Sequence, residues 1–164
     1  MFNFFKKNKE DKNAVEIRSP FVGKCFKVDD IPDEVFASNM MGEGIGFESK
    51  DGILYSPVEG EILQVFPTKH AIVMKSKEGL EILLHIGIDT VGMKGEGFES
   101  FVKSGDKVKP GDKLISFDLN LINEKAKSTL SPMVITNKEI IDNIDFNYGE
   151  VDENSIVCKI NIKE

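Results

Sequence analysis

The chain has 164 residues, enough for one domain with a sizeable core, and no stretch approaches the roughly 18 apolar residues of a membrane span. The formal net charge is −7, from 28 acidic and 21 basic residues, which argues against nucleic acid as the main partner. Two cysteines, Cys25 and Cys158, are too few for a disulfide framework and lack metal-site spacing. With no signal peptide visible, we expect a cytoplasmic protein.

The first 18 residues differ in composition from the rest of the chain. Three phenylalanines stand among four lysines in residues 1–12. Such a segment is either a flexible tail or a short helix lying on an anionic membrane, and it is too short to anchor firmly. We expect a flexible tail over residues 1–18 with at most peripheral membrane contact, followed by one domain over residues 19–164.

Strand-like segments dominate the remaining sequence, and they are short, rich in β-branched residues and separated by turn residues. In chain order they cover residues 24–28, 60–66, 71–75, 80–88, 113–117 and 155–162. Short helical turns are predicted over residues 33–41, after Pro32, and over residues 118–127, where Asp118 can cap the helix. This pattern predicts an all-β fold, an antiparallel sandwich or barrel with a few short helical turns.

A weak internal repeat supports this fold class. Residues 19–28 and 56–65 both read S-P-x-x-G-x-x-x-x-V, and a third pair, Ser131-Pro132, opens another apolar run. Chance recurrence of turn residues is the alternative. We favour two copies of a hairpin-like unit packed together.

The two histidines flank a predicted hairpin. His70 directly precedes the strand over residues 71–75, and His85 lies within the strand over residues 80–88, directly after Leu84. A two-residue loop would place the histidines directly opposite one another, whereas a three-residue loop with Gly79 as a bulge would put them on opposite faces. Lys77-Glu78 is a poor pair for a two-residue turn, so the sequence leaves both registers open.

In the first register, alternation sorts the side chains into two faces. The expected core face contains Ala71, Val73, Ile82, Leu84, Ile86 and Ile88. The other face contains Thr68, His70, Ile72, Leu83, His85, Gly87 and Asp89, a polar cluster edged by apolar residues.

Such a histidine pair suits phosphoryl chemistry. A neutral imidazole nitrogen can attack phosphorus and hold the phosphoryl group covalently. The second imidazole can donate a hydrogen bond to the phosphoryl oxygens, and Thr68 can fix the tautomer of that ring. The alternative is two unrelated histidines, one buried and one on the surface.

The segment from His85 to Val91, with Lys94-Gly95-Glu96-Gly97-Phe98, resembles the phosphorylation-site signature of the glucose-family enzyme IIA proteins of the sugar phosphotransferase system. The likeness runs from Ser19 to the end of the chain. It includes residues 31–33, 36–37, 41–45, 56–60, 66–71, 105–108 and 124–130.

This resemblance implies a phosphotransferase component. His85 would carry the phosphoryl group, His70 would stabilise it, and Thr68 would bond to His70. The donor would be the phosphocarrier protein HPr, and the acceptor a cysteine on an enzyme IIB domain of a sugar permease. No cofactor is implied beyond the covalent phosphate, and zinc would bridge the histidines only with a carboxylate from a regulated enzyme. The family fold is an antiparallel β sandwich, and the resemblance favours the register that brings the histidines together.

The resemblance also implies a docking patch around the histidines. Its apolar part would contain Phe36, Met40, Met41, Phe66, Leu83 and Val91. Asp33 and Asp89 match acidic positions that meet an arginine of the partner. Met40-Met41 replaces branched aliphatic residues, and ordinary core filling is the alternative role for these two side chains.

Two other functions are weaker. Gly105-Asp106 and the segment Val73-Met74-Lys75-Ser76 resemble parts of biotinyl and lipoyl carrier domains, but in those domains the lysine hairpin follows the Gly-Asp turn. A zinc enzyme would need a third ligand beside the histidines, for which Asp89 is the candidate. Neither the sugar nor any regulated enzyme can be identified from the sequence.

Overall fold

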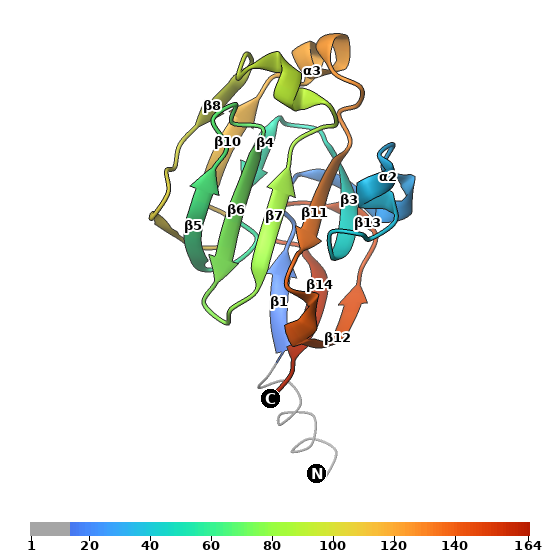
Figure 1. Ribbon diagram of the computed structural model, residues 1–164, viewed down its shortest axis with the longest axis vertical. Helices are drawn as coiled ribbons and strands as arrows, with labels where there is room; N and C mark the ends of the chain where they lie inside the picture. Colours follow the sequence, from blue (N-terminus) through green and yellow to red (C-terminus); the bar gives the residue numbers. More distant parts are fainter. Residues whose placement is uncertain (1–13) are drawn as a thin grey trace.

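The computed structural model describes residues 14–164 and shows an antiparallel β protein with short helical turns (Figure 1). The strands are β1 (Ala14–Arg18), β2 (Gly23–Lys27), β3 (Glu43–Ser49), β4 (Ile53–Tyr55), β5 (Gly60–Val65), β6 (Ala71–Ser76), β7 (Glu81–His85), β8 (Phe98–Ser100), β9 (Lys107–Val108), β10 (Lys113–Phe117), β11 (Ser131–Ile135), β12 (Ile141–Phe146), β13 (Gly149–Val151) and β14 (Ile156–Ile162). The helical elements are η1 (Val28–Asp30), α2 (Glu34–Ala37), η2 (Thr90–Met93), α3 (Leu119–Lys125) and η3 (Lys138–Ile140). The predicted fold class is confirmed.

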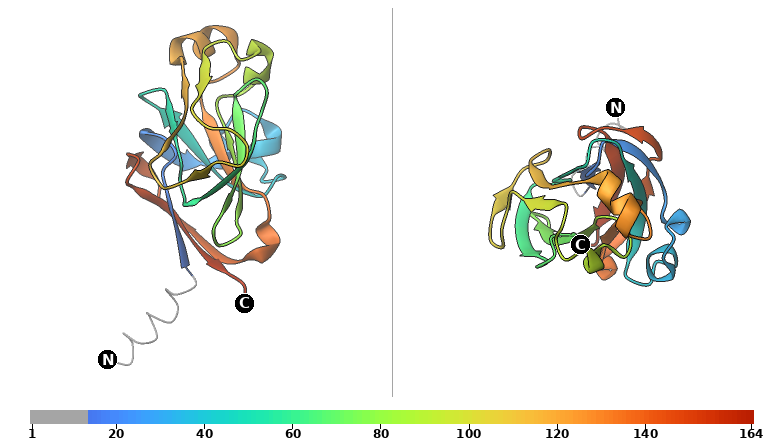
Figure 2. Two further views of the ribbon diagram at one scale, coloured as in Figure 1. Left: turned by 90° about the vertical axis from the view of Figure 1, so that its left-hand side faces the viewer. Right: turned by 90° about the horizontal axis from the view of Figure 1, so that it is seen from above.

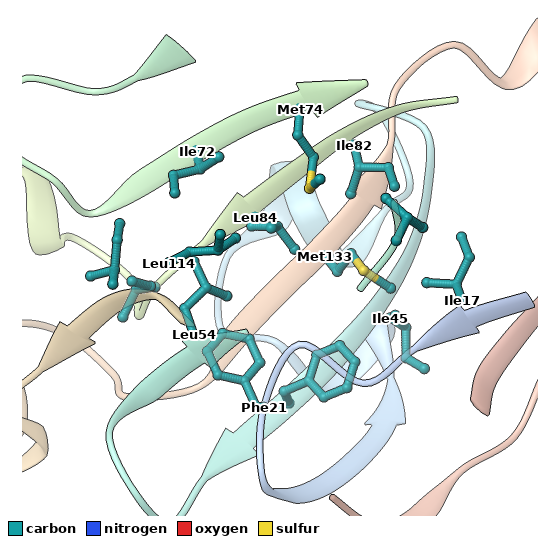
Figure 3. Packing of buried hydrophobic residues seen from close by; sticks show 14 of the residues in the cluster. Ile17, Phe21, Ile45, Leu54, Ile72, Met74, Ile82, Leu84, Leu114 and Met133 are labelled. Atoms are coloured by element: carbon teal, nitrogen blue, oxygen red, sulfur yellow. The ribbon is translucent and has the colours of Figure 1, made fainter. Parts of the chain in front are cut away.

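The strands form three sheets around a common interior (Figure 2). The largest has the order β13-β2-β3-β11-β7-β6-β5-β9, and the smaller ones have the orders β1-β14-β12 and β4-β10-β8. The apolar side chains of the main core point into this interior from all three sheets (Figure 3). Fully burying one such side chain contributes about 1.5–3 kcal/mol, so this core is the main source of stability.

A second, smaller apolar cluster contains side chains of η1, α2, β6, β7 and β11. Its buried members are Val28, Ile31, Phe36, Ala71, Leu83, Ile88 and Val134. Leu83 lies between Ile82 and Leu84 of the main core, so strand alternation places this cluster on the opposite face of β7. The cluster lies beneath the two histidines, and its Phe36 contacts His85.

The internal repeat is present as a reciprocal pair of backbone hydrogen bonds. The Arg18 N–H donates to the Pro57 carbonyl (3.0 Å), and the Tyr55 N–H donates to the Pro20 carbonyl (2.8 Å). In each bond, the residue before the serine of one segment donates to the proline carbonyl of the other segment. The two Ser-Pro segments are therefore packed together, as expected of two copies of one unit.

The domain begins earlier than expected. Residues 14–18, assigned to a flexible tail from the sequence, form β1 and pair with β14, and Val15 and Ile17 are buried. The A-V-E-I-R segment has the alternation of a half-buried strand, but its partner lies at the other end of the chain. The expected membrane contact of residues 1–12 lies outside the described residues. No helix within residues 14–164 is long and apolar enough to span a membrane.

Two aspartates cap the short helices, of which only Asp118 was predicted from the sequence. The Asp33 carboxylate accepts hydrogen bonds from the Val35 and Phe36 N–H groups, and the Asp118 carboxylate accepts one from Leu121. Both helices are shorter than predicted. Asn39, with a left-handed φ of 60°, follows the end of α2 and redirects the chain toward β3.

The hairpin of β6 and β7 has the three-residue loop, and the favoured two-residue register is wrong. Ala71 pairs with His85 and Val73 with Leu83, and the Ser76 N–H donates to the Leu80 carbonyl (2.8 Å). Gly79 takes a φ of +103°, which favours glycine.

The one-residue difference exchanges the faces of β6. Ile72 and Met74 therefore join the main core with Ile82 and Leu84, while Ala71 lies on the face of Leu83.

Candidate functional site

The two histidines lie next to each other. His85 is the last residue of β7, at the end that points toward α3 in Figure 1. The ring centroids of His70 and His85 are 5.0 Å apart, with the planes at 80°. A single anion can therefore contact both rings, although the hairpin register is the one expected to separate them.

His70 reaches this face because it precedes the regular part of β6. It lies in a bend, directly after Lys69, which has a left-handed φ of 58°. Strand alternation does not apply in a bend, so the side chain is free to turn toward His85. The His70 carbonyl still accepts the Ile86 N–H (2.7 Å), which ties the bend to the segment after β7.

One hydrogen bond determines the tautomer of His85. Its Nδ1 lies 2.7 Å from the Gly87 carbonyl oxygen. A carbonyl only accepts, so Nδ1 carries the proton. In the neutral ring Nε2 then holds an unshared electron pair, so this atom is chemically able to act as a nucleophile.

Burial keeps both imidazoles neutral. Burial, and to a smaller extent the charge of His85, lower the pKa of His70 from 6.5 to about 4. Burial also lowers the pKa of His85, while the hydrogen bond to Gly87 and the charges of Asp33 and Asp89 oppose part of that shift. At neutral pH both rings are therefore uncharged.

Thr68 contacts the second histidine. Its Oγ1 lies 2.5 Å from Nδ1 of His70, and Thr68 is the second residue of the turn that leads into the bend. A hydroxyl that donates to Nδ1 leaves the proton of His70 on Nε2. In that tautomer Nε2 is a hydrogen-bond donor suited to an oxyanion.

Aromatic rings flank the histidines. The Phe36 ring centroid is 5.1 Å from that of His85, and the Phe66 centroid is 5.5 Å from that of His70. Phe36 and Leu83 are buried, at 8% and 6% exposure, so they form the floor and not the surface of the expected patch. Both pack into the second apolar cluster, which accounts for the difference.

The exposed part of the expected patch is its rim. Met40, Met41 and Val91 are 72%, 38% and 58% exposed, while the buried methionines of residues 14–164 lie in the main core. Met40 and Met41 therefore do not fill the core, which was the alternative role. They lie in the turn that follows α2, whose Phe36 contacts His85.

Both predicted acidic residues lie close enough to His85 to act on it electrostatically. Asp33 uses one carboxylate oxygen to cap α2. Asp89 has a left-handed φ of 62° and an exposed side chain just before η2. The site thus combines an apolar rim with negative charge, which favours a partner carrying apolar and basic groups.

Two buried hydroxyls near His85 were not recognised from the sequence. Thr90 Oγ1 donates to the Ile86 carbonyl (2.6 Å), and Ser131 Oγ accepts the Gly87 N–H (2.9 Å). Ser131 was noted only as part of a third Ser-Pro pair. A serine at the start of an apolar run gives no signal that it will contact a residue 44 positions away.

The other chemistries considered have little structural support. Within residues 14–164 no group of three or more His, Cys, Asp or Glu side chains is placed to hold a metal ion. Lys75, the candidate for a carrier lysine, lies inside β6 and pairs with Glu81.

Comparison with known proteins identifies the family. The sequence model of the family described as phosphoenolpyruvate-dependent sugar phosphotransferase system, EIIA 1, matches residues 15–141. The chain belongs to this family. The match begins inside β1, which agrees with the earlier start of the domain seen in the structure.

EIIA proteins with established names resemble the chain over most of its length. A PTS system glucose-specific EIIA component of Bacillus cereus is 52% identical over 137 residues, covering 84% of this chain and 83% of the relative. The one of Staphylococcus epidermidis is 51% identical over 140 residues, with 85% and 84% covered. The solved glucose permease IIA from Mycoplasma capricolum has a TM-score of 0.85 and 38% identity, with 89% and 95% covered. The chain is an EIIA component of the sugar phosphotransferase system, with the fold of that family.

Proposed function

We propose that the chain is a phosphohistidine carrier that accepts a phosphoryl group on Nε2 of His85. The donor is the phosphorylated carrier protein HPr, and the acceptor is a cysteine of an enzyme IIB domain of a sugar permease. The observation that carries this proposal is the hydrogen bond from Nδ1 of His85 to the Gly87 carbonyl, 2.7 Å long. It leaves Nε2 as an unprotonated nucleophile beside a second, neutral imidazole.

In the loading step, the Nε2 electron pair attacks phosphorus as the phosphorus–nitrogen bond of the donor breaks. The electron pair of the broken bond stays on the donor imidazole. Nδ1 of His85 keeps its proton and donates it to the Gly87 carbonyl oxygen, so the phosphorylated ring is an imidazolium next to a dianionic phosphoryl group. That charge makes the ring a good leaving group when a thiolate of the IIB domain attacks in the second step.

His70 stabilises the phosphoryl group without bonding to phosphorus. With Thr68 donating to its Nδ1, its Nε2–H is free to donate to phosphoryl oxygens on His85, whose ring centroid lies 5.0 Å from that of His70. A preorganised donor of this kind costs no reorganisation when charge moves onto the transferring group. With a pKa near 4 before loading, His70 meets the incoming phosphoryl group as a neutral donor.

Docking of both partners uses the exposed rim of the site. Met40, Met41 and Val91 supply apolar area, and Asp33 and Asp89 supply negative charge beside the nucleophile. Unbranched, polarisable methionines adapt to surfaces of different shape, which suits a carrier that must bind a donor and an acceptor in turn.

The names of the relatives support a glucose permease as the first IIB partner to test. A cytoplasmic location follows from the proposed partners, and two buried free thiols are compatible with a reducing compartment.

The proposal is tested by labelling. The protein is incubated with the general phosphotransferase enzyme, HPr and phosphoenolpyruvate, and intact mass is recorded before and after acid treatment. We expect one acid-labile phosphate, absent from His85→Ala. Transfer from the loaded protein to a panel of IIB domains then identifies the acceptor. Normal labelling of His85→Ala would overturn the proposal.

A further inference from the structure

The Gly87 carbonyl decides which nitrogen of His85 reacts, so the groups that hold this carbonyl also control the site. Gly87 has a φ of +66°, and a Cβ there would lie 2.7 Å from the Thr90 methyl carbon and 2.8 Å from the Ser128 carbonyl oxygen. Only glycine fits this position. Glycine, however, is also the residue whose backbone turns most freely, so its orientation must be fixed by contacts from outside.

Ser131 provides such a contact. Its side chain is fully buried, and its Oγ accepts the Gly87 N–H at 2.9 Å. The hydroxyl proton is donated to the Thr129 carbonyl (3.0 Å), which directs a lone pair of the oxygen toward Gly87. Ser131 is the first residue of β11, which pairs with β7 and β3, so the contact connects Gly87 to the central sheet.

The neighbouring peptide groups are held as well. Thr90 Oγ1 donates to the Ile86 carbonyl (2.6 Å), and the Ile88 N–H donates to the Ser128 carbonyl (2.9 Å). These bonds fix the chain on either side of Gly87. The Ser131 bond acts on the Gly87 N–H itself, and the two backbone rotations of Gly87, φ and ψ, separate this group from the carbonyl that binds His85.

We propose that Ser131 is a positioning residue for phosphoryl transfer, because its buried hydroxyl holds the Gly87 backbone so that the carbonyl keeps the proton of His85 on Nδ1. The inference depends on the proposed function for the role of His85. Without the hydroxyl, the Gly87 N–H has lost its acceptor in a place closed to water. The Ile86–Gly87 peptide then shifts to find another partner, which changes φ and ψ of Gly87 and moves its carbonyl away from Nδ1 of His85. The proton of His85 then redistributes to Nε2, which blocks the nucleophile.

The experiment compares Ser131→Ala with Ser131→Thr, which keeps the hydroxyl, and with Ser56→Ala. Ser56 is a matched control because it is also fully buried and its hydroxyl donates to a backbone carbonyl, that of Val58 (2.7 Å). The tautomer of His85 is read from the ring ¹⁵N chemical shifts, without any phosphoryl donor. The rate of phosphate loading from HPr is measured separately.

We expect Ser131→Ala to show the Nε2–H tautomer of His85 and to load about fivefold more slowly, the shift that loss of one ordinary hydrogen bond produces in an equilibrium. Ser131→Thr and Ser56→Ala should keep the wild-type tautomer and rate. A Ser131→Ala protein with the Nδ1–H tautomer and the wild-type rate would overturn the inference, as would equal slowing by Ser56→Ala.

If Ser131→Ala does not fold, Ser131→Val replaces it, because valine and threonine have the same size and differ by the hydroxyl. A change of the His85 tautomer in Ser131→Val but not in Ser131→Thr supports the inference. The wild-type tautomer in both variants overturns it. A wild-type protein that takes no phosphate would instead refute the proposed function, and the tautomer result would still decide the role of Ser131.

Discussion

Lowering the pH from 7 to 5 should destabilise the protein through His70. In the folded chain His70 stays neutral until the pH approaches 4, whereas in the unfolded chain its pKa is near 6.5. Between these values the unfolded state binds more protons, so the stability is present above pH 6.5 and lost as the pH falls toward 4. One pKa unit is worth about 1.4 kcal/mol, so the full effect is about 3 kcal/mol, of which about 2 kcal/mol falls between pH 7 and 5.

The assay is urea unfolding at pH 7 and pH 5 for the wild type and His70→Gln. Glutamine keeps hydrogen-bonding capacity but does not titrate, so the variant should lose about 2 kcal/mol less on acidification than the wild type. Carboxylates titrate equally in both proteins and cancel in the difference. His85→Gln is the second comparison, since burial lowers the pKa of His85 in the same direction. An identical fall in stability for wild type and His70→Gln would refute the reasoning that His70 is held neutral by burial.

Two further predictions concern transfer and docking. His70→Gln should still load phosphate onto His85 but pass it to the IIB cysteine more slowly, because a positioned donor contributes about 2.7–4 kcal/mol where charge moves between groups; onward transfer at the wild-type rate would contradict the supporting role. Met41→Asp should weaken HPr binding about tenfold in calorimetry, since it places charge in the apolar rim. Phe101→Asp is the control, because Phe101 is 49% exposed and follows β8 of a different sheet; equal weakening by both would show that the rim is not the docking surface.

Much of the fold could be predicted because its signals are local. The Ser-Pro repeat, the Asp118 cap of α3 and the short strands between turn residues each depend on a few adjacent positions. β1 was missed because a five-residue alternating segment identifies a strand only when its partner is known, and that partner, β14, ends two residues before the end of the chain.

The hairpin register could not be predicted, since both faces of β6 and β7 carry apolar residues. Shifting the pairing by one residue puts Ile72 on the core face in place of Val73. Neither arrangement buries a charged side chain. The conformation of Gly79 decides between them, because a third loop residue with positive φ relieves the unsuitable Lys77-Glu78 turn. Nothing in the identity of the two histidines bears on that choice.

The histidine pair forms because both rings lie where the ladder of β6 and β7 ends. His85 is fixed by its pairing with Ala71, the last pair of the ladder. The nitrogen of its ring that lacks a proton is set by Gly87, beyond the strand. His70 is set by the bend after Lys69, before the other strand begins. The residues that align the two imidazoles are therefore in two turns, tied to each other by the bond from the Ile86 N–H to the His70 carbonyl. The site therefore depends on backbone conformations at Lys69 and Gly87 that strand alternation does not describe. For this reason the proximity of the two histidines could be inferred from the sequence, whereas the backbone conformations that bring their rings together could not.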